Sequence, residues 1–401
     1  MPQLLSPTDI PSADLIRSVR DRFPTDPASQ RAIDRKFERR QGPGWSPLTL
    51  DELSEAVHRL LVVQDDLNCD FEIRNASFLT GGASKIQMSF ELLTRSDPTP
   101  RRLLLRMDPP ESLNATIKTS EFDVLRGVAG ALPTPPVHWV DDEARYLPEP
   151  GMICGFAEGV TKPTLTRTGQ VSGLGTNFGP GLRKPLGEQL ISGLAALHTI
   201  DPTSWVSDAL ALPAVGTTDS ASWQLNFERQ LWTLDKLDAS PIMDLASNWL
   251  ARNRPTLDRV SVVHGDFRSG NFLFDESTAT ITAWLDWESA HLGDRHYDLA
   301  YCSQELFGHY DESGGTFLVS GLVPRDEFFT RYEHASGLSV DPDRLRWYSI
   351  FCGFSATVKT LATSMRIAQL GRSHQDILLA RLEGTVPILL GQLGRQLREV
   401  I

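Results

Sequence analysis

The side chains best suited to chemistry lie in a short stretch of the chain, residues 262–287. Asp266 comes five residues before Asn271, and Asp286 ends the next strand-like run. Carboxylate and amide oxygens with few other donors suit Mg²⁺, which keeps several waters and prefers sites shared with phosphates. A carboxylate that the metal does not need can accept a proton from an attacking hydroxyl group. Arg268 lies between these residues and can balance phosphate charge.

Two strands and a turn must bring these side chains together. Residues 271–274 and 281–286 have strand composition, and residues 276–279 between them have turn composition. In a hairpin centred on that turn, the numbers of facing residues sum to 557. The facing pairs are then Phe272 with Leu285, Phe274 with Ala283, Leu273 with Trp284, and Asn271 with Asp286. Facing α-carbons are roughly 5 Å apart, so this register predicts that amide and carboxylate meet at the open end, beside Asp266.

These motifs are similar to the catalytic centre of protein-kinase-like enzymes, where an aspartate and an asparagine share one loop and a second aspartate follows the next strand pair. His264-Gly-Asp266 followed by Asn271 resembles the aminoglycoside phosphotransferase family of small-molecule kinases, and so does the segment Gly293–Ala300. The resemblance covers about residues 70–360 in order. It implies a bilobal α+β fold of the protein-kinase type, with a small antiparallel sheet in the N-lobe and a mostly helical C-lobe.

The resemblance also implies roles for individual residues. Asp266 would be the base that orients the acceptor hydroxyl, and Arg268 would contact the transferred phosphoryl group, where protein kinases carry a lysine. Asn271 and Asp286 would hold Mg²⁺ against the phosphates of ATP. The alternative for all four residues is an acidic loop that faces solvent.

Upstream, Thr80-Gly-Gly-Ala-Ser84 resembles the turn that covers the nucleotide phosphates in this family. Gly81 and Gly82 would let backbone N–H groups approach phosphate oxygens, with Ser84 at the end of the turn. An ordinary hairpin turn is the alternative.

The family usually has a lysine on the third strand, paired with a glutamate of the following helix. Arg106 and Glu121 take these places here, and arginine can contact phosphate with two N–H groups. The alternative is a surface arginine at a strand end. The resemblance further implies that adenine binds to the backbone near Gly155 and Ala157.

The chain divides into an N-terminal helical extension (1–65), an N-lobe (66–155) and a C-lobe (156–401). The N-lobe is predicted to contain one helix, 120–128, and strands at 71–79, 86–93, 103–106, 137–140 and 152–156. In the extension, Thr49 stands three residues before Glu52, which is a capping-box pattern. The apolar stripe behind it comprises Leu53, Ala56, Val57, Leu60 and Leu61. We expect this stripe to pack against the body of the protein, with a partner-binding helix as the alternative.

A glycine-rich stretch, residues 169–181, is predicted to be a long loop, either functional or a disordered insertion. Among the histidines, His264 is expected to brace the catalytic loop and His198 to be structural. Asp294 and Asp298 are expected to satisfy loop N–H groups or to cap a helix.

Two residues after Asp286 leave alternatives open. Trp287 and Glu288 can face the acceptor pocket, or Trp287 can belong to the core.

Composition restricts the class of protein. The 401 residues are 40% hydrophobic, which is enough for more than one core. The net charge of −12 argues against a nucleic-acid-coating surface, and no run approaches the ~18 apolar residues of a membrane helix. The four cysteines lack zinc or disulfide spacing, and no signal peptide is evident. We therefore expect a cytoplasmic protein without nucleic-acid or membrane partners, its oligomeric state open.

The motifs together predict an ATP- and Mg²⁺-dependent phosphotransferase that moves the γ-phosphoryl group to a hydroxyl of a small molecule. A nucleotide-binding regulatory module is the alternative, although such a module would not need Asp266, Asn271 and Asp286 together. A metal-dependent hydrolase would require further histidines. The acceptor remains open between aminoglycoside antibiotic, sugar, amino alcohol and lipophilic alcohol, as does the choice of ATP or GTP.

Overall fold

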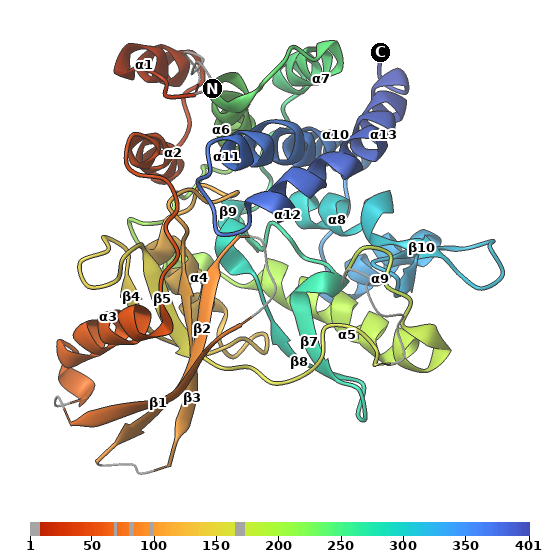
Figure 1. The fold of residues 1–401 in the computed structure, drawn as a ribbon. Helices are drawn as coiled ribbons and strands as arrows, with labels where there is room; N and C mark the ends of the chain where they lie inside the picture. Colours follow the sequence, from red (N-terminus) through yellow and green to blue (C-terminus); the bar gives the residue numbers. More distant parts are fainter. Residues whose placement is uncertain (1–8, 68–69, 80–83, 96–98, 165–172) are drawn as a thin grey trace.

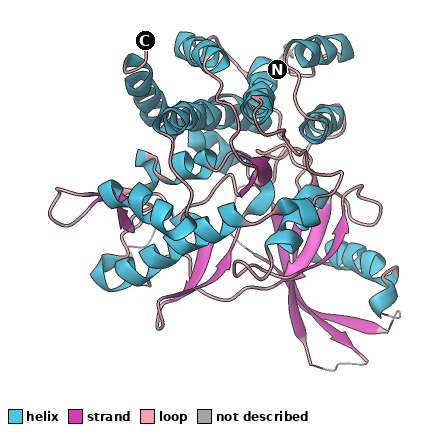
Figure 2. Cartoon of the chain, turned by 180° about the vertical axis from the view of Figure 1, so that it is seen from behind, coloured by secondary structure: helices cyan, strands magenta, loops and turns pink. Residues whose placement is uncertain are grey.

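The computed structural model describes residues 9–67, 70–79, 84–95, 99–164 and 173–401. Figure 1 shows a sheet-bearing lobe at the lower left and a helical lobe above and to the right of it. Figure 2 shows the same division from behind, with most helices gathered away from the large sheet.

The sheet-bearing lobe is built on five antiparallel strands in the order β1-β2-β3-β5-β4. They are β1 (Phe71–Phe78), β2 (Ile86–Thr94), β3 (Arg101–Met107), β4 (Val137–Asp141) and β5 (Gly151–Gly155). Helix α4 (Lys118–Val128) connects β3 to β4 and buries Val124, Leu125 and Val128, whereas Phe122 is only half-buried. The predicted five-stranded antiparallel sheet with one helix is confirmed.

Helix α3 (Leu50–Val62) begins at the expected capping box, because the Thr49 hydroxyl accepts from the Glu52 N–H while the Glu52 carboxylate accepts from the Thr49 N–H. Its apolar stripe is fully buried against side chains of the sheet, among them Met88, Phe90 and Leu105. The expectation that this stripe packs within the protein is confirmed.

The two helices before α3 pack elsewhere. Helices α1 (Ala13–Arg22) and α2 (Pro27–Arg40) place Val19, Ile33 and Phe37 in a core cluster of the helical lobe. The segment before β1 therefore runs from one lobe to the other.

The helical lobe contains most of the remaining elements. Its helices are α5 (Gly179–Thr199), α6 (Asp219–Asp235), α7 (Pro241–Arg252), α8 (His296–Cys302), α9 (Arg325–Ser336), α10 (Pro342–Thr357), α11 (Ser364–Gln369), α12 (Asp376–Arg381) and α13 (Val386–Arg398). Its short strands are β6 (Ser261–Val263), β7 (Phe272–Asp275), β8 (Thr280–Trp284), β9 (His291–Gly293), β10 (His309–Tyr310), β11 (Phe317–Val319) and β12 (Val323–Pro324). Strand β6 pairs with β9, and β7 pairs with β8.

The glycine-rich stretch was predicted to be a loop as far as residue 181, but its last residues are helical. Helix α5 already begins at Gly179, because Pro180 stands in the first turn, where its missing N–H costs no hydrogen bond. Residues 165–172 lie outside the described residues, so the rest of the predicted loop is described only from Gly173 to Phe178.

A cluster of buried aromatic side chains packs against the β7–β8 hairpin. Phe267 stacks on Trp284 at 3.9 Å between ring centroids, and Phe272, Phe274 and Trp287 are buried in the same cluster. This packing holds the hairpin and the loop before it as one rigid unit.

Among the described residues, one helical stretch, Asp376–Arg398, is long and apolar enough by length and composition to cross a membrane, which the sequence did not lead us to expect. Core helices of soluble proteins meet the same criterion, so this is weak evidence. The absence of a membrane partner stays a prediction.

Candidate active site

The β7–β8 hairpin has a different register from the predicted one. Phe272 faces Trp284 and Leu273 faces Ala283, but Phe274 faces Ile281, because a bulge follows Leu273. Asn271 consequently lies beside Leu285, whose N–H donates to the Asn271 carbonyl at 2.8 Å. The predicted pairing of Asn271 with Asp286 is therefore wrong by one residue. The prediction assumed a regular ladder, and neither the bulge nor the left-handed Ala279 in the turn has a clear sequence signal.

A backbone turn, rather than strand pairing, aims Asp286. Asp286 has φ 66° and ψ 51°, a left-handed conformation that is uncommon for residues other than glycine. The next residue, Trp287, is buried and donates from its indole nitrogen to the Trp284 carbonyl at 3.0 Å. Trp287 is thus a core residue, the second of the two predicted alternatives, and its burial stabilises the turn that exposes the Asp286 carboxylate.

The loop that carries Asp266 is fixed by Asp298 of α8. The Asp298 carboxylate accepts from the N–H groups of His264 and Gly265, at 2.7 and 2.8 Å. The His264 ring lies 3.0 Å from the Leu285 carbonyl, so the ring connects the loop to the hairpin. His198 is also buried, 3.2 Å from Asp298. This geometry agrees with bracing roles for both histidines and with a framework role for Asp298.

Asp266 itself is held from two sides. Its Oδ1 accepts from Arg268 Nε at 2.7 Å, and Tyr301 of α8 also hydrogen-bonds to this carboxylate. Burial alone would lower the pKa of Arg268, but Asp266 raises it above its ordinary value, so the guanidinium stays charged. Asn271 donates from its amide nitrogen to the Asp266 backbone carbonyl at 2.8 Å, a bond that does not use the amide oxygen.

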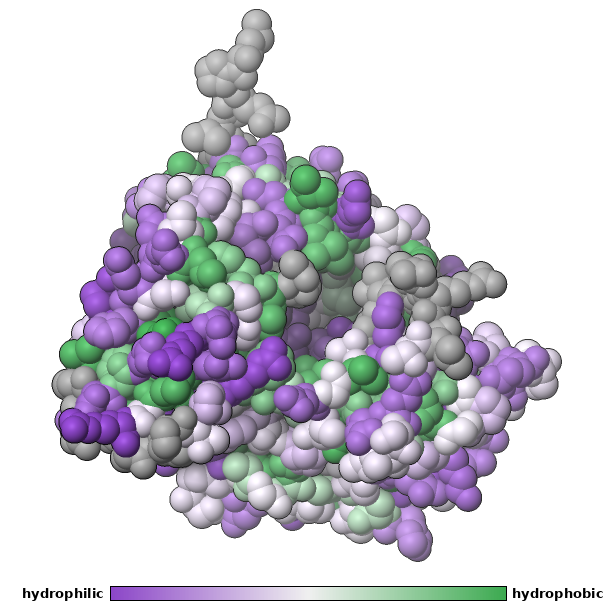
Figure 3. Space-filling model, turned by 60° about the horizontal axis from the view of Figure 1, so that its bottom comes forward, coloured by the Kyte–Doolittle hydropathy of each residue, from purple (hydrophilic) through white to green (hydrophobic). Residues whose placement is uncertain are grey.

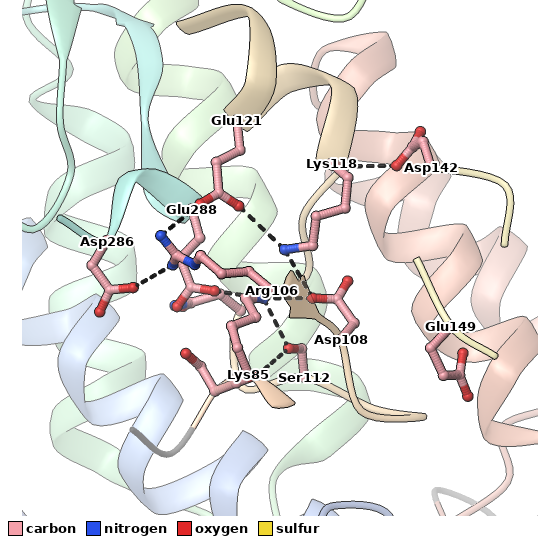
Figure 4. A network of polar contacts seen from close by, with 12 residues as sticks. Lys85, Arg106, Asp108, Ser112, Lys118, Glu121, Asp142, Glu149, Asp286 and Glu288 are labelled. Atoms are coloured by element: carbon pink, nitrogen blue, oxygen red, sulfur yellow. Dashed lines mark hydrogen bonds and ion pairs between the residues drawn. The ribbon is translucent and has the colours of Figure 1, made fainter. Parts of the chain in front are cut away.

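Arg106 reaches the hairpin from the sheet. Its guanidinium lies 3.4 Å from Glu121 of α4 and 2.8 Å from Asp286. The expected Arg106–Glu121 pair therefore forms, and Arg106 is buried rather than a surface residue. Figure 4 shows the arginine between the two acids, at the junction of the lobes.

Two further cations, which no sequence motif predicted, lie beside Arg106. Lys85 lies 2.7 Å from Asp108 and 2.6 Å from Glu288, and Lys118 lies 3.0 Å from Asp108 and 3.2 Å from Glu121. Both lysines are buried. The only local signal was the position of Lys85 directly after the glycine turn, since a lysine in sequence usually indicates a solvated surface.

The acids of this cluster differ in their protonation. Burial raises the pKa of Asp286 to about 6, and the charge of Glu288 adds to this effect although Arg106 opposes it. Burial likewise opposes ionisation of Glu288, yet Lys85, Lys118 and a hydrogen bond from Asn114 bring its pKa to about 2. Asp286 is thus the acid whose charge is least balanced by the protein, and 39% of its side chain is exposed.

The donor set around Asp286 suits a hard cation. Among the described residues, no three His, Cys, Asp or Glu side chains cluster as metal ligands. One carboxylate and one amide oxygen leave most coordination positions to phosphate and water, which is the arrangement that Mg²⁺ favours. Asp286 and Asn271 therefore fit a metal that arrives with a nucleotide.

Only some of the other predicted nucleotide-binding residues lie among the described residues. Gly81 and Gly82 lie outside the described residues, while the Ser84 carbonyl accepts from the Ser112 hydroxyl at 3.0 Å. The Gly155 N–H donates to the Pro136 carbonyl at 2.7 Å, and a side chain at Gly155 would collide with Pro136. An adenine contact in this region would therefore use other backbone groups, such as those of Ala157.

A cavity of about 120 Å³ lies next to this site, bounded by α2, α6 and the segment after Asp286. Its lining includes Trp223, Glu228, Ser289, His291 and Lys359. Ser289 packs against Gly265, directly before Asp266, so the cavity borders the catalytic loop. The space-filling view in Figure 3 shows the surface hollowed near its centre, with hydrophilic side chains at the bottom of the hollow.

Comparison with known families gives one match over most of the chain. The model of the phosphotransferase enzyme family matches residues 88–348, about two thirds of the sequence. Among solved structures, an aminoglycoside phosphotransferase-like protein of Ralstonia eutropha superposes with a TM-score of 0.60 at 19% identity, over 81% of this chain and 92% of that one. This similarity supports the predicted bilobal kinase-like fold.

The curated relatives carry two kinds of name. "Probable acyl-CoA dehydrogenase IBR3" of Arabidopsis thaliana is 27% identical over 298 residues, which are 69% of this chain and 34% of that protein. "Acyl-CoA dehydrogenase family member 11" of Gallus gallus is 32% identical over 167 residues, 39% of this chain and 21% of that protein. "Aminoglycoside 3'-phosphotransferase" of Streptomyces fradiae is 31% identical over 130 residues, 32% of this chain and 42% of that protein. The chain thus spans about a third or less of the acyl-CoA dehydrogenase relatives.

Proposed function

Since the chain belongs to the phosphotransferase enzyme family, we propose that it moves the γ-phosphoryl group of ATP, bound with Mg²⁺, to a hydroxyl group of a small molecule. The observation that carries this proposal is the junction of the lobes, where Arg106 from the sheet meets Asp286 beside Asp266 and Asn271. Phosphoryl transfer needs a cation that binds phosphate, an acidic side chain that binds a metal and a second acidic side chain that accepts a proton from the hydroxyl.

Arg106 and Asp286 would exchange partners when the nucleotide binds. In this structure they form an ion pair at 2.8 Å. Mg²⁺, when bound, would neutralise the phosphate charge that develops during transfer. Asp286 and the amide oxygen of Asn271 would hold that ion, which frees Arg106 to contact phosphate oxygens while Glu121 keeps it oriented.

Asp266 would orient the acceptor hydroxyl and accept its proton. Arg268 donates to one carboxylate oxygen of Asp266, and the acceptor hydroxyl would displace Tyr301 from this carboxylate. Arg268 remains charged beside Asp266 and would stabilise the transferred phosphoryl group.

The cavity beside Ser289 is the proposed acceptor site. Its volume of about 120 Å³ is close to the ~150 Å³ that admits a benzene-sized molecule, so it supports a compact acceptor or one end of a longer one. The names of the relatives add aminoglycosides and acyl-CoA compounds that carry a hydroxyl group to the acceptors that should be compared with amino alcohols and sugars.

The test is release of ADP from ATP in the presence of each acceptor, with wild-type protein and Asp266→Ala. We expect one acceptor class to stimulate ADP release, and the variant to bind nucleotide normally but to lose turnover by about 10²–10⁴-fold, the usual contribution of a general base. GTP in place of ATP measures nucleotide preference. Undiminished turnover in Asp266→Ala would refute the base assignment, and nucleotide binding without turnover on any acceptor would favour the regulatory alternative.

A further inference from the structure

Lys85 is a second cation that crosses from the sheet to the segment after Asp286. It lies just before β2, with only 1% of its side chain exposed. Its ammonium group lies 2.7 Å from Asp108, 2.6 Å from Glu288 and 3.2 Å from the Ser112 hydroxyl. Two of its N–H groups donate to Asp108 and to the Ser112 hydroxyl, and its charge pairs with Glu288. Lys85 therefore connects groups of both lobes in a place that solvent hardly reaches.

Glu288 is fixed at both carboxylate oxygens. Oε2 lies 2.6 Å from Lys85, and Oε1 accepts from the Asn114 side-chain amide at 2.7 Å. Lys85 and Asn114 both come from the sheet-bearing lobe, whereas Glu288 belongs to the short turn Trp287–Ser289 of the helical lobe. Figure 4 shows Lys85 and Arg106 in one cluster with Asp286 and Glu288.

The turn that Glu288 anchors begins at Asp286. A left-handed aspartate is strained and persists only where its surroundings determine the backbone. Trp287 is held from the core side by its bond to Trp284, and Glu288 is held from the sheet side by Lys85. The direction of the Asp286 carboxylate therefore depends on both anchors.

We propose that Lys85 is a positioning residue whose ion pair with Glu288 holds the Asp286–Ser289 turn in the geometry that presents Asp286 to the nucleotide-bound metal. The inference rests on the proposed function, in which Asp286 is a metal ligand. It differs from the Arg106–Glu121 pair, because Lys85 touches neither Glu121 nor Asp286 and acts only through Glu288.

Lys85→Met keeps the apolar length of the side chain and removes its charge. We expect the Mg²⁺ concentration for half-maximal nucleotide binding, measured by calorimetric titration, to rise by about 10–100-fold, the usual effect of losing a residue that orients a metal ligand. Turnover at saturating Mg²⁺ should fall much less. Lys85→Arg should restore most of the Mg²⁺ response, since it keeps a buried cation at this point.

Glu288→Gln and the double variant Lys85→Met/Glu288→Gln test whether the two residues act as one unit. If they do, the double variant requires no more Mg²⁺ than the worse single variant. Effects that multiply would overturn the proposal.

Lys118→Met is the matched control. Lys118 is equally buried and also binds Asp108, but it contacts Glu121 instead of Glu288. We expect Lys118→Met to lower the melting temperature about as much as Lys85→Met does, but without any rise in the Mg²⁺ requirement. An equal rise in this variant would mean that any lost lysine loosens the site, and would contradict a specific role for Lys85.

The design separates this inference from the proposed function. If Asp286→Asn leaves the Mg²⁺ requirement unchanged, the metal assignment itself fails. If Asp286→Asn raises it and Lys85→Met does not, only the role of Lys85 fails. Should Lys85→Met not fold, Glu288→Gln carries the same Mg²⁺ measurement.

Discussion

Two buried ionic networks join the lobes, and they differ in how completely their acids are neutralised. The cleft network consists of Lys85, Arg106, Asp286 and Glu288. The α2 network consists of Lys36, Arg40, Glu111 and Asp235. Both connect the sheet-bearing lobe to the helical lobe through residues that are far apart in the sequence.

The α2 network is closed on itself. Glu111 lies 2.6 Å from Lys36 and also pairs with Arg40, while Asp235 lies 2.7 Å from Arg40 and 3.6 Å from Lys36. Neither acid has any exposed side-chain area. Although burial opposes ionisation, Lys36 and Arg40 bring the pKa of Glu111 to about 2. Glu111 faces three cations, since Arg372 lies 3.9 Å away, and Asp235 faces two, so no ligand is needed to complete this network.

In the cleft network, by contrast, Asp286 shares one arginine with Glu121, and its pKa is raised to about 6. The acid that is incompletely neutralised is also the one that reaches solvent. This difference separates a network that stabilises the fold from one that is completed by a ligand, and charge composition alone would not reveal it.

Asp286→Asn should have the largest effect on activity. We expect turnover to fall about a thousandfold, since a bound metal ion contributes several kcal/mol to transition-state stabilisation. The melting temperature should not fall, because the variant removes a carboxylate that burial disfavours. Asp275→Asn, at the exposed opposite end of the same hairpin, is the control and should retain activity. Full activity in Asp286→Asn would mean that the cleft network is not completed by a ligand, and that it does not differ from the α2 network in this respect.

Glu111→Gln should show the opposite behaviour. Because it leaves Lys36 and Arg40 buried with one acid between them, we expect the free energy of unfolding to fall by about 3–5 kcal/mol. Denaturant titration measures this change. Glu38→Gln, an exposed glutamate on the same helix, should leave stability unchanged. A Glu111→Gln variant as stable as wild type would mean that α2 does not join the lobes energetically.

Acidification should separate the two networks without mutation. A proton competes with the metal at Asp286, so metal-dependent nucleotide affinity should fall about tenfold between pH 7 and pH 5, as the pH passes the pKa of about 6. Glu111 has a pKa below its ordinary value, so its contribution to stability is complete above pH of about 4.5 and is lost only as the pH falls toward 2. Calorimetric titration and thermal unfolding over the same pH range measure the two responses. A parallel loss of affinity and of Glu111-dependent stability between pH 7 and pH 5 would contradict this assignment.

Arg35→Ala should have the smallest effect. Arg35 lies on α2 beside the closed network and pairs with Asp142 at 3.0 Å and with the exposed Glu143 at 2.9 Å. Solvent screens the pair with Glu143, and Arg35 keeps access to water beside the less exposed Asp142. We therefore expect a loss of about 1 kcal/mol. If Arg35→Ala lowered the free energy of unfolding as much as Glu111→Gln, the partly exposed pairs of Arg35 would stabilise α2 as much as the buried acids do.

Local patterns predicted the elements better than the contacts between them. The capping box at Thr49 and the stripe behind it identified α3, because both depend on residues within one or two turns. Arg106 and Glu121 were identified through the family resemblance, which places a cation on the third strand and a glutamate on the following helix. The hairpin was expected, but its register was wrong by one residue, since a bulge has a small energetic cost and little sequence signal.

The sequence by itself determined which residue types enter the site, because Asp266, Asn271 and Asp286 follow from spacing along one loop and one hairpin. Only the tertiary structure decided how those groups are oriented and balanced. Lys85 meets Glu288, and Arg40 meets both Glu111 and Asp235, across long stretches of chain. In a sequence, a buried lysine or arginine looks the same as one on the surface. Its partner is chosen by the packing of whole lobes, which place opposite charges together where water cannot solvate them.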